Sequence, residues 1–282
     1  MMIARLKAYR KNPSVQYTLM SIAASGINFL TLIIWGRVFS VEDYGSITTL
    51  QAFLSNIAVF VTPLQIMLCK AMAMHTTEKD KIVTDLLHIM FMIYLAELFF
   101  MIATARMLIN YLHFAGGIEI FLFGSLVFLN NSYIVLNGIV QGKQDFILLG
   151  RTNLVLYVLK MLLSTSSGLH FSGPLAVMFG FAAAECVCII LIIGKYKDIF
   201  RQLFSSHKFR IDLSVLKNYF WMFVLYMIVS LYMNNGDLLL GNLYCSQEEI
   251  GFYSVAISLS KISIFFIDFI AENLLISPRK FL

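Results

Sequence analysis

The stretch that decides the fold reads Asn234-Asn235-Gly236-Asp237-Leu238-Leu239-Leu240-Gly241-Asn242-Leu243-Tyr244 and continues through Gln247-Glu248-Glu249-Ile250-Gly251-Phe252-Tyr253 to Lys261. It places Asp237 near the end of one apolar segment. After a short acidic turn with a glycine, a second apolar segment carries Lys261. An ionisable side chain in hydrocarbon is costly, so each such residue is a candidate for a functional role. The stretch predicts two membrane helices that belong to a larger bundle.

The composition of the whole chain points the same way. Of its 282 residues, 59% are hydrophobic and 13% are charged, and the mean hydropathy is +0.80. Soluble domains carry about 25% charged residues, and a soluble fold of this length could not bury so much apolar surface. We therefore expect an all-α polytopic membrane protein. The net charge of +5 would suggest a nucleic-acid partner in a soluble chain, but here the charge belongs to the loops, so none is predicted.

The spacing of reactive residues points away from an enzyme. The four cysteines form no CxxC pair, and the five histidines are scattered without an HExxH motif. GxSxG, Walker and GxGxxG motifs are also missing from the sequence. We predict no catalytic residues, no metal site and no cofactor.

Eight membrane spans follow from the rule that a spanning helix needs about 20 apolar residues. The first apolar run, Val15 to Phe39, is far longer than the roughly 7–15-residue core of a signal peptide, so we expect it to be retained. Most basic residues lie on one side if the spans alternate, which predicts that both termini are cytoplasmic. The predicted spans are 15–39, 45–68, 82–104, 118–140, 149–168, 174–194, 218–241 and 251–276. Pro63 should kink the second one.

The longest segment between spans divides the chain. Residues 195–217 interleave apolar side chains with Arg201 and Lys208, which is typical of an amphipathic helix at the headgroup layer. The predicted organisation is a six-helix lobe over 1–194, this cytoplasmic linker, and an incomplete second lobe of two helices over 218–282.

Polar residues inside the spans gather on single helix faces. The first span has such a face with Asn28, and it suits either packing between helices or the lining of a cavity. In the fifth span, Asn153 and Lys160 share a face, with Lys160 roughly 18 Å from the cytoplasmic end. Glu185 lies at similar depth in the sixth span. Two interpretations remain open: a Lys160–Glu185 ion pair that fixes the packing, or a Lys160 that faces a watery cavity and binds an anion.

The remaining charged residues differ in how much they indicate. For Asp237 and Lys261, cavity lining is favoured over packing, and Asp237 could face Ser254, Ser258 or Lys261. Arg37, at the end of the first span, either extends to the headgroups or contacts a phosphate. Glu97, in the third span, has no obvious partner.

Three stretches together resemble the polysaccharide-transport branch of the multidrug/oligosaccharidyl-lipid/polysaccharide (MOP) exporter superfamily, the O-antigen-type flippases. The stretch Gly36-Arg37-Val38-Phe39-Ser40-Val41-Glu42-Asp43-Tyr44-Gly45 is similar to the family's turn between helices one and two. Asn137-Gly138-Ile139-Val140-Gln141-Gly142 is similar to the end of its helix four. The third set, Asp237, Glu249, Gly251 and Tyr253, is similar to its pattern across helices seven and eight.

The resemblance implies a MATE/MOP-like fold, with two six-helix lobes around a cavity that opens alternately to each membrane face. The substrate would be an undecaprenyl-diphosphate-linked oligosaccharide, moved from the cytoplasmic to the periplasmic leaflet of the bacterial inner membrane. A polysaccharide polymerase and a chain-length regulator are implied partners, besides membrane lipid. Arg37, Lys160, Lys261, Asn28 and Asn153 would bind substrate, and Asp237 or Glu185 would couple an ion. Because the family usually has twelve or more helices, the chain is expected to be truncated at its C-terminus.

Other functions stay open at this point. A multidrug or cation antiporter of the same superfamily would use acidic residues in the first lobe, such as Glu97 and Glu185. A membrane-embedded polymerase or ligase would need a large periplasmic loop, and the predicted outer loops are short. An inactive remnant is the last alternative.

Overall fold

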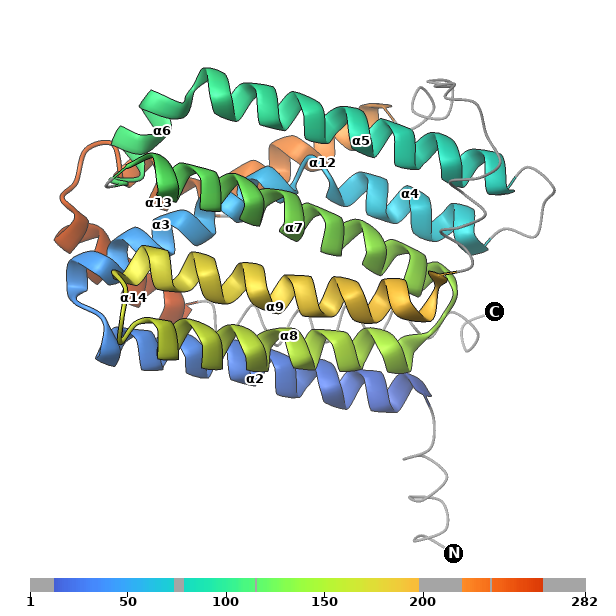
Figure 1. Ribbon diagram of the computed structural model, residues 1–282, viewed down its shortest axis with the longest axis horizontal. Coiled ribbons are helices and arrows are strands. Elements are labelled where there is room, and N and C mark those ends of the chain that lie inside the picture. Colours follow the sequence, from blue (N-terminus) through green and yellow to red (C-terminus); the bar gives the residue numbers. More distant parts are fainter. Residues whose placement is uncertain (1–12, 74–78, 115, 198–219, 234, 261–282) are drawn as a thin grey trace, which may run out of the picture.

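The computed structural model describes residues 13–73, 79–114, 116–197, 220–233 and 235–260, and throughout these residues it is helical. The long helices run side by side in a bundle (Figure 1). The helices are α2 (Pro13–Val38), α3 (Val41–Ala58), α4 (Thr62–Ala73), α5 (Lys79–Ala103), α6 (Ala105–Tyr111), α7 (Gly117–Gly142), α8 (Phe146–Ser167), α9 (Gly173–Lys195), α12 (Phe220–Met233), α13 (Gly236–Gly241) and α14 (Gln247–Ser260).

The predicted class, a polytopic helical membrane protein, is confirmed by these helices. Five of them are long and apolar enough to cross a membrane: α2, the Ile82–Ala103 part of α5, α7, α8 and α9. The α3–α4 pair makes a sixth if it is one bent span. These six correspond to the first six spans predicted from the sequence. The predicted linker lies largely outside the described residues, as do Lys261 and the end of the eighth span.

The second span is broken rather than merely kinked. The axes of α3 and α4 differ by 47° across residues 59–61. Pro63 is the second residue of α4, where the missing N–H of a proline costs no helical hydrogen bond. The proline therefore starts the second half-helix, and the bend lies in the residues just before it.

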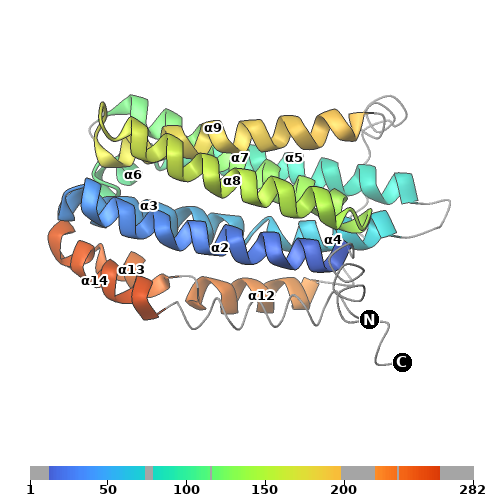
Figure 2. The same cartoon turned by 90° about the horizontal axis from the view of Figure 1, so that it is seen from below.

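The predicted seventh span is also interrupted. Helix α12 ends at Met233 and α13 begins at Gly236, with Asn235 between them in the left-handed conformation at φ 62°. Asparagine is one of the few residues that adopt this conformation readily. Figure 2 shows α12, α13 and α14 together along one side of the bundle, next to α2 and α3.

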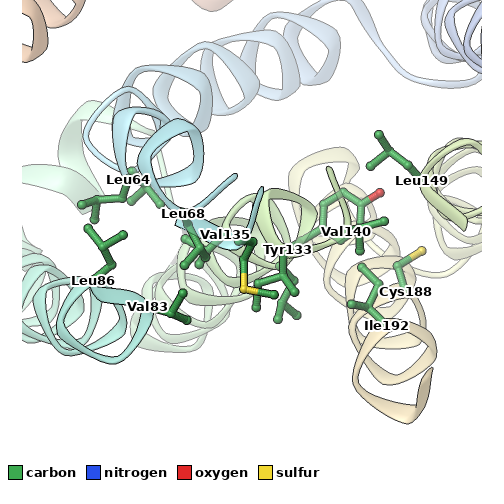
Figure 3. Close-up of a cluster of buried hydrophobic side chains, with 14 of the residues drawn as sticks. Leu64, Leu68, Val83, Leu86, Tyr133, Val135, Val140, Leu149, Cys188 and Ile192 are labelled. Carbon is green, nitrogen blue, oxygen red and sulfur yellow. The ribbon is translucent and has the colours of Figure 1, made fainter. Parts of the chain in front are cut away.

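Two clusters of buried side chains hold the first six spans together. One joins α2, α4, α5, α7, α8 and α9 (Figure 3), and the other joins α2, α3, α5, α6, α7 and α9. Labelled members of the first cluster are Leu64, Leu68, Val83, Leu86, Tyr133, Val135, Val140, Leu149, Cys188 and Ile192. By contrast, many large apolar side chains on the outer surface of the bundle are exposed, as expected for a surface that lies against lipid.

Small residues bring helix backbones into direct contact. A Cβ on Gly138 would lie 2.7 Å from the carbonyl oxygen of Gln65, and one on Gly142 would lie 2.5 Å from that of Cys69. The two glycines are four residues apart on α7, the spacing that allows close approach of membrane helices. Helix α7 therefore packs its backbone directly on α4.

Candidate functional site

Helices α8 and α9 meet closely, and both are long and apolar enough to cross a membrane. A Cβ on Gly180 would lie 2.5 Å from the backbone nitrogen of Ser164. Ala184 follows one turn later on α9 and is fully buried. These small residues let the two backbones touch, and they place the charged side chains of both helices within reach of each other.

Lys160 and Glu185 form an ion pair across this contact. The Nζ atom of Lys160 lies 2.8 Å from Oε1 of Glu185. The lysine side chain is 12% exposed and the glutamate side chain 1% exposed. Of the two interpretations that the sequence left open, the paired arrangement is therefore the one present. At 1.5 Å per residue, Lys160 lies about 21 Å along α8, well inside a hydrocarbon core about 30 Å thick.

Aromatic side chains surround the pair. The ammonium of Lys160 lies 4.2 Å from the centroid of the Phe181 ring, a distance at which the ring face attracts a cation. Phe181 in turn lies beside Trp35 of α2, with the ring centroids 5.8 Å apart. Because aromatic rings shield the ammonium from water, its interaction with the carboxylate is stronger than at a surface.

Two hydrogen bonds in series connect α2 to the backbone of Lys160 on α8. The indole N–H of Trp35 donates to the hydroxyl of Ser164 at 3.0 Å, and that hydroxyl donates to the carbonyl oxygen of Lys160 at 2.5 Å. Three helices thus converge on one polar group in the membrane. Trp35 and Ser164 are both fully buried, so these two hydrogen bonds fix the position of the lysine backbone.

The second carboxylate oxygen of Glu185 is not satisfied. Oε2 is buried and has no hydrogen-bond partner among the described residues. A buried acceptor without a donor costs free energy, and it is a place where a proton or a donor group binds favourably.

Asn153 belongs to the same face of α8. Its side-chain oxygen accepts a hydrogen bond from the hydroxyl of Tyr133 on α7 at 2.6 Å. Asn28 is half-buried on α2, and Arg37 is exposed in the last turn of that helix. Arg37 therefore does not join the pair, and its exposure suits either the headgroup or the phosphate interpretation.

Asp237 has a different neighbour from those expected. Its carboxylate accepts a hydrogen bond from the hydroxyl of Tyr253 at 2.6 Å, in an exposed position. Ser254 instead lies 2.7 Å from the Thr48 hydroxyl on α3. The expectation that Asp237 faces Ser254 fails, because Ser254 is on the side of α14 that packs on α3. Ser258 donates to the carbonyl oxygen of Ser254 within α14 at 2.8 Å, and Lys261 is outside the described residues.

A second polar group was not anticipated. The amide of Asn131 on α7 donates to Oε2 of Glu97 on α5 at 2.8 Å. Asn131 is fully buried. The sequence shows both residues inside spans, but it does not show which face of each helix meets the other. The hydrogen-bond partner of Glu97, which the sequence did not indicate, is therefore Asn131.

A third polar group closes the end of the α8–α9 pair that is predicted to be cytoplasmic. Asp145 caps α8 by accepting from the Leu148 N–H at 3.2 Å, and it also accepts from Lys195 and from the Tyr196 hydroxyl. Partial burial raises the pKa of Asp145, but these hydrogen bonds outweigh it and hold the pKa below its usual value. Burial, and then the neighbouring carboxylate, raise the pKa of Tyr196.

The described residues offer no metal centre, since no group of three or more His, Cys, Asp or Glu side chains comes together in them. Comparisons of the chain with models of known families, with characterised proteins and with solved structures found no match.

Proposed function

We propose that the chain acts as a flippase for undecaprenyl-diphosphate-linked oligosaccharides in the bacterial inner membrane, with both termini cytoplasmic. The observation that carries the proposal is a contact between two of the three stretches that resemble the flippase family. Gly45 ends the first stretch and Gly251 is in the third. A Cβ on Gly45 would lie 2.9 Å from the nitrogen of Gly251, and one on Gly251 would lie 2.3 Å from the carbonyl oxygen of Val41.

This contact supports the resemblance because the two stretches are some 200 residues apart in the chain. Hydrogen bonds flank the two glycines: Ser46 donates to Gln247 at 3.0 Å, and Thr48 lies 2.7 Å from Ser254. Unrelated chance matches would have no reason to meet at one helix crossing. The second stretch also has a packing role, because its Gly138 and Gly142 place α7 against α4.

The charges inside the membrane suit this substrate. A diphosphate is an anion that needs cationic partners, and Lys160 supplies one inside a candidate membrane span. Protonation of Glu185 would weaken its hold on Lys160, and the lysine could then bind the diphosphate. Under this proposal Asn153 and Asn28 contact sugar hydroxyls, and Arg37 and Lys261 contact phosphate outside the central pair. Glu185 or Asp237 couples the transport to an ion.

The test is complementation in a bacterial strain that lacks its own O-unit flippase. The full chain should restore surface polysaccharide. When the variants are compared at matched amounts of inserted protein, Lys160→Ala should abolish the restoration, whereas the exposed Lys195→Ala should not. A well-inserted chain that restores nothing would refute the proposal. So would a Lys160→Ala variant that restores as much as the parent.

A cation antiporter is the second candidate, and one observation favours it. Glu97 and Glu185 both lie in candidate membrane helices of the first lobe, and each has a buried carboxylate oxygen without a hydrogen-bond partner in the part of the chain that the structure describes. Drug-efflux assays in the same strain separate the two functions. Loss of resistance in Glu185→Gln, without any effect on polysaccharide, would support the antiporter and count against the flippase.

A further inference from the structure

A groove between α5 and α7 lies on the outer surface of the first lobe. Its volume is about 830 Å³, within the range of about 300–1,000 Å³ that is typical of small-molecule sites. Figure 1 shows α5 at the edge of the bundle, with α7 running alongside it. Leu98, Phe121 and Phe128 line the groove, and each is more than half exposed. In a membrane, these exposed side chains place the mouth of the groove against lipid.

Most of the residues that line the groove are apolar, but a buried polar group lies next to it. Tyr94 and Glu97 of α5 line it, and Asn131 of α7 is bonded to Glu97. Two acceptor atoms here are buried without a hydrogen-bond partner among the described residues: Oε1 of Glu97 and Oδ1 of Asn131. Asn131 is 0% exposed and Tyr94 8%. The hydroxyl of Ser125 in the lining is already bonded to the Phe121 carbonyl.

The unsatisfied atoms define what the groove can bind. A carboxylate oxygen and an amide oxygen are acceptors only. None of the residues that line the groove carries a positive charge. A carboxyl group in hydrocarbon is stabilised by a partner with opposite charge. The missing partner is therefore a cation with several N–H donors, carried by an apolar body that can enter from the bilayer.

We propose that this groove binds a lipophilic primary ammonium ion, with its ammonium at Glu97 and Asn131 and its apolar body between α5 and α7. An ammonium has three N–H donors, enough for the two free acceptors. The site is distinct from the Lys160–Glu185 pair, which lies on α8 and α9. It is independent of the flippase proposal, since it needs neither Lys160 nor the diphosphate.

The probe for the test is monodansylcadaverine, a fluorescent primary amine with an apolar body. The full chain in phosphatidylcholine nanodiscs is titrated with it, and the signal of empty nanodiscs is subtracted. We expect saturable binding that Glu97→Gln weakens about ten-fold or more, because hydrogen bonds to a charged group are the stronger kind. The matched control is Glu42→Gln, an exposed carboxylate at the start of α3, which should bind as the parent does.

A neutral analogue separates charge recognition from simple apolar binding. N-pentyl dansylamide has the same fluorophore but no amine, and it should bind weakly and equally to the parent and to Glu97→Gln. If the neutral analogue binds as tightly as the amine, the groove accepts lipid chains without recognising charge, and the proposal is overturned. Absence of saturable binding by the parent chain would overturn it as well.

A second variant keeps the test decisive if Glu97→Gln does not fold. Gly124 lines the groove, and the nearest atom to an added Cβ there is the terminal methyl of Met101 at 3.4 Å, an ordinary contact. Gly124→Leu should fill the groove and weaken amine binding while leaving Glu97 in place. Unchanged binding in a folded Gly124→Leu chain would place the amine elsewhere and contradict the proposal.

Discussion

Removing the lysine of the intramembrane pair should destabilise the fold far more than removing a surface lysine. In Lys160→Met, the carboxylate of Glu185 stays 1% exposed and loses its partner at 2.8 Å. The direct attraction at that distance is about 6 kcal/mol at an effective dielectric constant of about 20. Desolvation offsets part of this, so we expect the variant to lose about 3–5 kcal/mol of unfolding free energy, as when one partner of a buried pair is removed.

The assay is equilibrium unfolding of the full chain in mixed micelles, with sodium dodecyl sulfate as the denaturant and circular dichroism as the signal. Lys195→Met is the matched control, because Lys195 pairs with Asp145 while 50% exposed, and such surface pairs contribute about 0–1 kcal/mol. The double variant Lys160→Met/Glu185→Leu removes both charges and should be more stable than Lys160→Met alone.

Two results would refute this reasoning. The single variant Glu185→Leu completes the cycle. If the loss of unfolding free energy in the double variant equals the sum of the losses in Lys160→Met and Glu185→Leu, the two side chains do not interact in the folded state. If Lys160→Met costs no more than Lys195→Met, the carboxylate of Glu185 is not held as a buried charge.

Three further predictions follow from the helix contacts and the cap of α8. Gly142→Leu should lower the thermal unfolding midpoint strongly, since its Cβ would lie 2.5 Å from the Cys69 carbonyl oxygen, whereas Gly194→Leu, with nothing within 4 Å, should change it little. Gly251→Leu should detach α14 from α3, seen as faster proteolysis of residues 235–260 in the folded chain than in the parent. The lowered pKa of Asp145 means that its ionised carboxylate stabilises the folded chain. This stabilisation is fully present above the usual pKa of 3.8 and is lost as the pH falls below it. The difference in thermal unfolding midpoint between the parent and Asp145→Asn should therefore shrink in acid.

The positions of the spans could be predicted because the length and hydropathy of an apolar segment determine whether it can cross a membrane. The first six predicted spans match helices within a few residues, and the deviations occur where local chemistry acts. Helix α3 begins at Val41 rather than at residue 45, because the hydroxyl of Ser40 caps it by accepting from the Asp43 N–H. The sequence also contains the Gly138–Gly142 spacing that predicts a close helix crossing, although it does not name α4 as the partner.

The side-chain contacts between helices could not be predicted, because the residues on one helix face do not show which other helix packs against it. The depth of Lys160 and Glu185 made a pair possible, but only the packing of Gly180 on Ser164 decides between a pair and an open cavity. Likewise, Glu97 needed the rotation of α7 that brings Asn131 toward it. The roles in substrate binding and ion coupling stay predictions.

The break between α3 and α4 separates two different helix contacts. Helix α3 makes its most extensive contact with α14, while α4 makes its most extensive contact with α7. Residues 59–61 are thus the only backbone that joins these two halves of the second span. A change in the bend there would move α3 and α14 together, and it would also require the contacts of α3 with α7 and α9 to repack. The contact between Gly45 and Gly251 would then transmit a displacement of α14 to α3.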